Sequence, residues 1–425
     1  MSTQSTPSIL FTHHSRQQGF RLLELSPDLA ELLSSDNPPT LELKSPAADS
    51  AATSNAHLAP AGEYVNICTP TQTYSIRQVQ SSNSLHILRP SSGVGVKTKD
   101  LKIVAGAGPT AESNGIDAND EDDDVNMDDS DQDLGLSIEG TVTTIAKCGS
   151  TLELHKPAEG FSAVPFLKSL LRVYDKGVWE DEYAAGQDED SSADCEETTK
   201  GTLERVFSDI PVSRAQCEHD WVDACAFITL PSQSKDSMCW RPSAEMKLEV
   251  WKRIVEGAVL QGIDLAKQFL VSDLWNSVLD DEGLAPFPRT LFKAVIRRIC
   301  ELGEGVERGI LSDMKWTSID RDTCLKWVGE VCLEAKAIGA ASAVGEGEYL
   351  NSWKDQLPEA WREYVSISIL PKSCYVHPEP NTICFATEAE RQKVKKNLPT
   401  DTSAATAAKK TRNWHELFKN KRQKQ

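Results

Sequence analysis

The sequence of 425 residues lacks the motifs of the common enzyme classes. It has no G-x-x-x-x-G-K-S/T loop to hold phosphates, no G-x-S-x-G, no H-E-x-x-H and no protein-kinase motif set. The segment 93–97 comes nearest to a phosphate loop, but it has neither the spacing nor the Ser or Thr. His13 and His14 fit a surface pair better than a pair of metal ligands. We therefore expect no catalytic residues, no cofactor and no enzymatic activity.

Cysteine pairs and long apolar runs are also missing. The eleven cysteines include no C-x-x-C pair, and most lie in apolar runs, which favours reduced thiols inside a core. Cys374, His377 and Cys384 come closest to a zinc pattern, but a fourth ligand at the usual spacing is absent, so we expect no metal. No apolar run reaches the roughly 20 residues of a membrane span, and the N-terminus has no secretory pattern, so we expect an intracellular protein without membrane contact.

Lys and Arg (45) are outnumbered by Asp and Glu (64), which gives a formal net charge of −19, but the acidic residues are concentrated in two places. Residues 112–133 hold eleven carboxylates and residues 180–197 hold nine more, with no Lys or Arg in either block. The rest of the chain is close to neutral. This pattern predicts two acidic linkers between folded parts, the first of them a disordered insertion at about 90–135.

The stretch 64–88 shows the clearest strand pattern in the chain. The segments Tyr64–Cys68, Thr73–Val79 and Leu85–Leu88 alternate apolar and polar residues, with breaks rich in Pro, Ser and Asn. The spacing predicts a three-strand antiparallel meander with one buried face.

The flanking residues extend this β region to residues 1–160. Further strands are expected at 19–25, 40–43, 136–145 and 151–155, with a short helix at Asp28–Leu33 capped by Ser26 and preceded by Pro27. We expect a β-barrel-like assembly domain over 1–160, then a short helix (161–174) and an acidic linker within 161–197.

The second half changes to helical periodicity. Helices are expected at 198–208, after the capping residues Ser213 and Ser243, and at 265–279, 289–302, 320–337 and 348–357. The helix after Ser243 carries an apolar stripe that ends at Val259. Strands at 373–376 and 382–385 predict a terminal hairpin. Three helices followed by a hairpin are the order of a winged helix, and this order recurs about three times, so we expect an α+β multidomain chain with tandem winged-helix modules over 198–390 and a basic tail over 391–425.

Three ordered segments resemble the Dcc family of sister-chromatid-cohesion accessory subunits, which belong to an alternative (Ctf-type) replication factor C clamp loader. The first match comprises Ile67-Cys68-Thr69, Thr73-Tyr74-Ser75-Ile76 and Ser82-Asn83-Ser84-Leu85. The second comprises Leu152-Glu153-Leu154, Pro157, Leu167–Leu171, Tyr174 and Gly177, and the third Trp240-Arg241 with Glu245-Met246-Lys247-Leu248.

The resemblance implies a non-catalytic clamp-loader subunit. Its β domain would assemble with the small accessory subunit and the large ATPase subunit, and would act on PCNA only indirectly. Its helical half would contact polymerase epsilon and single- and double-stranded DNA, supporting DNA replication and cohesion. The strand positions expected at the subunit interface are Ile67, Tyr74, Ile76, Leu85 and Ile87; their alternation equally fits an internal core.

Cations on the helical half are candidate phosphate contacts, although such residues are commonly solvated partners of Asp and Glu. They are Arg241, Lys247, Lys252, Arg253, Lys293, Arg297, Arg298 and Lys372. In the tail, Lys409, Lys410, Lys419, Lys421 and Arg422 are spaced like a two-part nuclear import signal, although a basic tail that binds polyanions fits as well. The alternative function is a tandem winged-helix transcription or chromatin factor.

Overall fold

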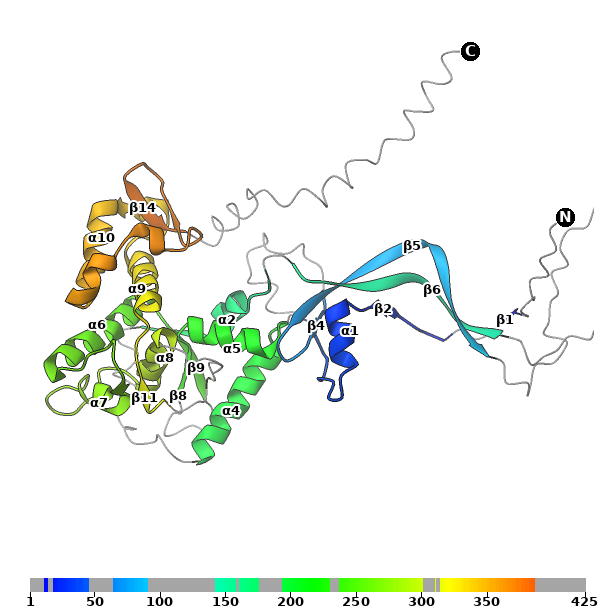
Figure 1. The fold of residues 1–425 in the computed structure, drawn as a ribbon, viewed down its shortest axis with the longest axis horizontal. Coiled ribbons are helices and arrows are strands. Elements are labelled where there is room, and N and C mark those ends of the chain that lie inside the picture. Colours follow the sequence, from blue (N-terminus) through cyan, green and yellow to red (C-terminus); the bar gives the residue numbers. More distant parts are fainter. Residues whose placement is uncertain are drawn as a thin grey trace, which may run out of the picture. The chain divides into compact units, whose positions relative to one another are not determined.

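The computed structural model describes residues 11–13, 18–45, 64–90, 142–157, 160–175, 193–229, 237–300, 310 and 314–386. The fold is α+β, as the sequence predicts (Figure 1). The chain forms two compact units. The first unit comprises Met1–Pro39 and Tyr74–Ala158, and the second comprises Thr40–Thr73 and Glu159–Gln425.

The first unit is built on a long two-stranded ribbon, with β5 (Thr73–Pro90) antiparallel to β6 (Val142–His155). The short strands β1 (Phe11–His13) and β2 (Leu22–Glu24) pair with β6 in parallel. Helix α1 (Pro27–Leu33) begins with Pro at its first turn and buries Leu29, which confirms the predicted helix. Ser26 occupies the N-cap position, but its side chain does not accept the cap hydrogen bond.

The predicted three-strand meander is wrong at its second break. Ser82 and Asn83 lie inside β5, and the segments 73–79 and 85–88 belong to the same strand. The reason is that β6 pairs with β5 on both sides of this break, at Ser75–Gln80 and at Leu85–Pro90, and the extra residues are absorbed as a register shift between Gln80 and Leu85. The strands expected at 136–145 and 151–155 likewise merge in β6.

The predicted barrel is not closed in the described residues. Closure requires that the outermost strands of a sheet pair with each other. In the first unit β6 has β5 on one side and the short strands β1 and β2 on the other, and no described pairing returns from those short strands to β5. The described residues of this unit therefore form an open, twisted ribbon.

The second unit begins with two short strands and then repeats one order of elements three times. Strands β3 (Glu42–Lys44) and β4 (Asn66–Cys68) pair antiparallel. The order that follows is helix, strand, two helices and a final pair of strands; in the second repeat, strand β11 (Trp316–Thr317) and a bridge between Cys300 and Ile319 take the place of that pair. In the first and third repeats, the last strand lies between the other two.

The first repeat contains α2 (Val164–Leu170), β7 (Arg172–Tyr174), α4 (Ala193–Ser208), α5 (Arg214–Asp223), β8 (Phe227–Thr229) and β9 (Met238–Pro242). The helix predicted over 161–174 is therefore too long, because its last residues pair as β7 with β9. Ser213 caps α5 by accepting from the backbone N–H of Gln216, as the sequence predicts.

The second repeat contains α6 (Ala244–Gln261), β10 (Phe269–Leu270), α7 (Val271–Asn276), α8 (Arg289–Ile299) and β11 (Trp316–Thr317), with a bridge between Cys300 and Ile319. The helix predicted over 265–279 is shorter, because Phe269 and Leu270 pair with β11. The predicted stripe on α6 fails at Val259, which is 72% exposed. Steps of four residues advance about 40° beyond a full turn, so Val255 and then Val259 rotate away from buried Trp251.

The third repeat contains α9 (Arg321–Lys336), η3 (Ala340–Ser342), β12 (Val344–Gly345), α10 (Glu346–Asp355), η4 (Glu359–Tyr364), η5 (Ile367–Ile369), β13 (Tyr375–Val376) and β14 (Thr382–Phe385). Helix α9 and the β13–β14 hairpin confirm the sequence prediction. One apolar core joins the second and third repeats, and a second core fills the space between α2, α4 and α5.

Candidate subunit and nucleic-acid interfaces

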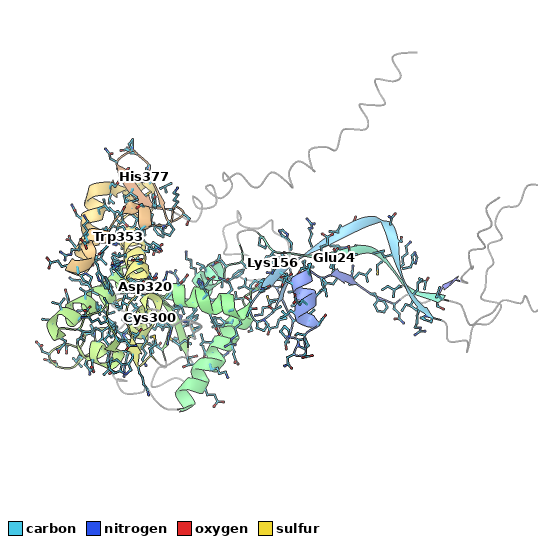
Figure 2. The ribbon with its side chains drawn as sticks, in the orientation of Figure 1. Glu24, Lys156, Cys300, Asp320, Trp353 and His377 are labelled. Atoms are coloured by element: carbon cyan, nitrogen blue, oxygen red, sulfur yellow. The ribbon has the colours of Figure 1, made fainter. Side chains whose placement is uncertain are left out.

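Tyr74 is an interior residue of the first unit. Its side chain is 1% exposed, and its hydroxyl donates to Asp28 Oδ2 at 3.2 Å. The Lys156 ammonium, just beyond β6, donates to the same carboxylate oxygen at 2.6 Å and lies 4.7 Å from the centre of the Tyr74 ring (Figure 2). This hydrogen bond from Lys156 is the largest cause that holds the pKa of Asp28 well below its usual range. Tyr74 thus ties β5 to α1, and a partner could reach it only after this unit opened.

The other strand positions differ in exposure. Ile76 and Ile87 on β5 are half-buried, and Leu85 is 46% exposed. Ile67 lies on β4 of the second unit, where it is buried. The structure therefore brings Ile76, Leu85 and Ile87 onto one ribbon and places Ile67 elsewhere.

The ribbon has an apolar row and a partly uncovered edge. Ile76, Leu85 and Ile87 stand opposite Leu154, Cys148 and Ala146 of β6. In the sheet, β5 has β6 on one side and the short strand β4 on the other. Because β4 has three residues, β5 has eighteen and a turn at Thr69–Gln72 joins them, β4 covers only the start of this outer edge. The later part of the edge, which carries exposed Leu85, is a candidate for the addition of a further strand.

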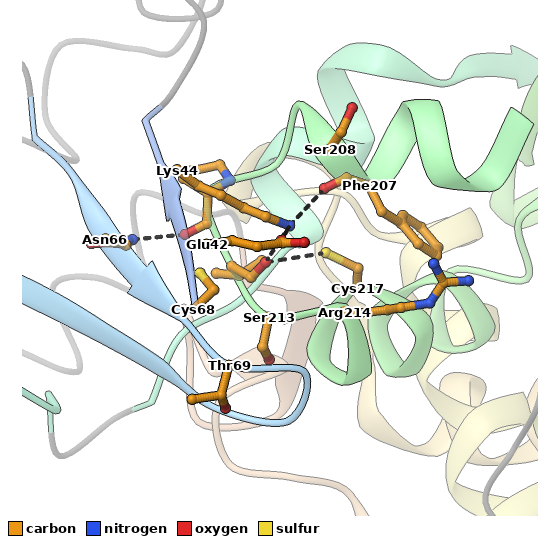
Figure 3. A network of polar contacts seen from close by, with 12 residues as sticks. Glu42, Lys44, Asn66, Cys68, Thr69, Phe207, Ser208, Ser213, Arg214 and Cys217 are labelled. Carbon is orange, nitrogen blue, oxygen red and sulfur yellow. Dashed lines mark hydrogen bonds and ion pairs between the residues drawn. The ribbon is translucent and has the colours of Figure 1, made fainter. Parts of the chain in front are cut away.

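A polar network that the sequence did not reveal holds the β3–β4 segment in the second unit (Figure 3). The side chain of Lys44 is 10% exposed, and its ammonium donates to the carbonyl oxygens of Phe207 at 3.2 Å and Val212 at 3.4 Å. Buried Asn66 donates from Nδ2 to the Pro211 carbonyl at 2.7 Å. The Ser213 N–H donates to Thr73 Oγ1 at 2.7 Å. These contacts fix the turn between α4 and α5, and the partners are too far apart in sequence for any local pattern to show them.

The eight candidate phosphate contacts do not form one group. Arg241 lies on β9, Lys247, Lys252 and Arg253 on α6, Lys293, Arg297 and Arg298 on α8, and Lys372 just before β13. Three of them are exposed, namely Lys252, Arg253 and Lys372; the others are half-buried.

Several of these cations have carboxylate partners. Lys252 lies 3.8 Å from Glu256 and Arg253 lies 4.0 Å from Glu249, each one helical turn apart. Arg298 Nε lies 3.2 Å from Oδ1 of Asp223 on α5. Helix α8 itself packs against α5, β8, α6 and α9, so most of its surface is covered by protein.

The cysteine and histidine positions considered for zinc do not converge. Cys374 and Cys384 are buried cysteines, whereas His377 is exposed on the turn after β13, with Nδ1 2.9 Å from the Thr382 carbonyl oxygen (Figure 2). Among the described residues, the ligand atoms of His219, Asp220 and Asp223 on α5 lie within 4.8 Å of one another.

A structural role accounts for the central carboxylate of that cluster. Asp220 is 4% exposed and accepts hydrogen bonds from the Ala163 N–H, from Ser162 Oγ at 3.0 Å and from Gln216 Nε2 at 2.9 Å. It thereby fixes the start of α2 on α5.

The predicted import residues Lys409, Lys410, Lys419, Lys421 and Arg422 lie outside the described residues. Among the helices that the structure does describe, none combines the length and the apolar character needed to cross a membrane.

Comparison with known proteins decides the family. The family model described as sister chromatid cohesion protein Dcc1 matches residues 20–403. The chain belongs to the Dcc1 family. This membership confirms the resemblance drawn from the three sequence segments and gives the Dcc1-family chain a role in sister chromatid cohesion, which is a nuclear process. None of the curated proteins compared with the Dcc1-family chain matched it.

Proposed function

We propose that this Dcc1-family protein is a non-catalytic accessory subunit of an alternative replication factor C clamp loader. Its ribbon would assemble with a small accessory subunit and the large ATPase subunit, and the helical unit would contact polymerase epsilon and DNA. The complex would load or unload PCNA and so support replication and cohesion. The family match over residues 20–403 is the observation that carries this proposal.

The ribbon supports a junction made by strand addition. An open edge strand with exposed apolar side chains is a template for a strand of another chain. Leu85 and Leu88 on β5 are each 46% exposed. A partner strand would pair with the backbone of β5 while its side chains covered these leucines.

Two neighbouring residues allow a controlled test of this junction. Leu85 and His86 are both exposed on β5 and, as successive residues of a strand, project to opposite faces. The full chain would be co-expressed with the replication factor C subunits and the small accessory subunit, and the complex isolated through a tag. Leu85→Asp should remove the partners, and His86→Asp should retain them. Stoichiometric complex with Leu85→Asp would refute the junction at this edge, and absence of complex with the unaltered chain would refute the function.

Tyr74→Asp is less informative for this purpose. It would also abolish the complex on the interface hypothesis, but Tyr74 is buried and bonded to Asp28, so the substitution would also unfold the first unit. The exposed leucine separates assembly from folding.

We further propose that the three repeats are winged helices. In this interpretation α5, α8 and the η4–η5 segment occupy the place of the helix that usually enters the major groove. Helix α8 packs against α5 and β8 of the preceding repeat, so little of its surface remains to enter a DNA groove. DNA contact would therefore use exposed cations such as Lys252, Arg253 and Lys372 on the phosphate backbone.

Salt-dependent binding distinguishes this proposal from a sequence-reading transcription or chromatin factor. Fluorescence anisotropy with unrelated single-stranded and duplex oligonucleotides should give similar affinities for all sequences. Replacing Lys252, Arg253 and Lys372 together by Ala should weaken all of them and reduce the salt slope by up to about 3. Strong preference for one duplex sequence would favour the alternative function.

Nuclear import by Lys409, Lys410, Lys419, Lys421 and Arg422 completes the proposal. Replacing these five residues by Ala in a fluorescent fusion should move the protein from the nucleus to the cytoplasm. Unchanged nuclear accumulation would show that import depends on another segment or on a partner.

A further inference from the structure

A surface depression of about 420 Å³ lies on the first repeat of the second unit. Elements α2, β7, α4 and β9 all contribute to it. Its lining residues are Leu170, Arg172, Arg205, Val206, Asp209, Ser237, Met238 and Cys239.

The depression exists because β9 starts before its neighbour. Arg172, the first residue of β7, pairs with Trp240, so Met238 and Cys239 have no β7 residue beside them. Leu170, at the end of α2, is 46% exposed at this place. Burial raises the pKa of the Cys239 thiol to about 11, so it is neutral at physiological pH and adds to the apolar floor.

Two arginines that have no carboxylate partner among the described residues border this apolar floor. Arg172 donates from Nη1 to Met238 Sδ at 3.9 Å, and neither Arg172 nor Arg205 forms an ion pair with any residue that the structure describes. Asp209 contributes one carboxylate to the lining. By contrast Arg214, on the next helix, pairs with Glu218 at 2.9 Å. The depression therefore combines an apolar floor with an excess of positive charge at its rim.

We propose that this depression binds an extended segment of a partner protein in which an apolar side chain is flanked by carboxylates. The apolar side chain would cover Leu170, Val206 and Met238, and the carboxylates would pair with Arg172 and Arg205. Arginine forms the strongest paired hydrogen bonds with carboxylates, and burial of the apolar contact would exclude water from them. Because β7 is an edge strand with exposed Val173, the segment can also extend along it.

The chain itself contains a competing acidic segment. Residues 180–190 hold six carboxylates and lie between β7 and α4 in the sequence. Occupation by this segment is a distinct outcome that the experiment must separate from partner binding.

Fluorescence anisotropy on the full chain tests the proposal with defined probes. The acidic probe is a labelled peptide Gly-Ser-Glu-Leu-Asp-Leu-Glu-Ser-Gly, and the matched probe carries Gln and Asn in place of Glu and Asp. The acidic probe should bind at least about 10-fold more tightly than the neutral one. Arg172→Glu with Arg205→Glu should weaken acidic-probe binding by about 10-fold or more, whereas Lys267→Glu with Lys326→Glu, two exposed lysines that do not line the depression, should leave it unchanged.

Three results would overturn the proposal. Equal binding of both probes would show that the carboxylates of the peptide do not contribute to binding. An equal loss of acidic-probe binding in the control variant would show that only the overall charge of the protein matters. Absence of binding would refute partner recognition directly. If binding then appeared when the six carboxylates of 180–190 were replaced by amides, the occupant would be the chain's own acidic segment. Far-ultraviolet circular dichroism and urea midpoints of each variant would show that the fold is retained.

Discussion

Arg298 Nε lies 3.2 Å from Oδ1 of Asp223, and this ion pair joins α8 of the second repeat to α5 of the first. The Arg298 side chain is 18% exposed and that of Asp223 is 34% exposed. A partly buried cation that already has a carboxylate partner suits repeat packing better than phosphate binding. The neighbouring cation Arg297 also has a partner in the structure.

Arg298→Ala should lower the free energy of unfolding by about 1–2 kcal/mol, because it leaves Asp223 half-buried without its cation. Arg253→Ala, whose side chain is 47% exposed, should change it by less than about 0.5 kcal/mol. Urea unfolding of both variants, with Asp223→Asn to complete a double-mutant cycle, measures the coupling. Unchanged stability together with weaker DNA binding in Arg298→Ala would instead support the phosphate-contact hypothesis for this residue.

The Asp28–Lys156 pair should make the first unit sensitive to acid. Lys156 lowers the pKa of Asp28 from its ordinary 3.8. A lowered folded-state pKa contributes stability that is present above the unfolded value and lost as the pH falls through the folded value. The melting temperature should therefore fall from about pH 5 downwards, and less steeply in Lys156→Met.

Nuclear magnetic resonance titration of the Asp28 carboxyl carbon in the unaltered protein and in Lys156→Met would show directly whether Lys156 lowers the Asp28 pKa. Its midpoint should move up towards the ordinary range in Lys156→Met. Lys147→Met, which changes an exposed lysine of β6, serves as the control and should leave the midpoint unchanged. Identical midpoints in all three proteins would contradict the assigned role of Lys156.

Two helical glycines should respond oppositely to Ala. A Cβ at Gly329 of α9 would lie 2.5 Å from Cζ2 of Trp353 and 2.9 Å from Cδ2 of Leu370, both in the core. Gly329→Ala should therefore cost about 1–3 kcal/mol through overpacking. Gly201 on α4 has no atom within 4 Å of such a Cβ, so Gly201→Ala should stabilise the protein by about 0.5–1 kcal/mol through helix propensity. The urea unfolding midpoints of the two variants measure these changes in stability. Stabilisation by both substitutions would show that α9 and Trp353 can move apart at little cost.

Sequence reasoning succeeded where the determinants are local. Ser213 and Ser243 cap helices as expected, because each cap depends only on the next few residues. It failed where a distant partner decides. Ser82 and Asn83 have turn composition but continue a strand because β6, from residue 142 onwards, pairs alongside.

The candidate sites show the same division. The alternation along β5 indicated partly buried side chains at Ile76 and Ile87, which the structure has half-buried. It could not separate buried Tyr74 from exposed Leu85, because both stand at apolar positions of the alternation. Likewise, the positive charge of α8 was visible, whereas its packing against α5 was not. Lys44 gave no sequence signal at all, since its acceptors lie more than 160 residues away.

Lys44→Met provides the most direct test of how the β3–β4 segment is held in the second unit. Methionine keeps most of the length of the side chain but removes the ammonium that donates to the Phe207 and Val212 carbonyls. Loss of a donor to buried acceptors should cost about 1–3 kcal/mol. Because the network also includes the bond from the Ser213 N–H to Thr73, amide hydrogen exchange of residues 207–217 should accelerate in this variant.

The matched control is Lys267→Met, which removes a lysine that is 80% exposed and paired with Asp264 at 3.0 Å. It should change stability by less than about 0.5 kcal/mol and leave exchange in 207–217 unaltered. If Lys44→Met behaved like this control, water would replace the ammonium at the two carbonyls without loss of stability. The position of β3 and β4 would then depend on Asn66, whose amide bonds the Pro211 carbonyl at 2.7 Å, and Asn66→Ala should show the loss instead.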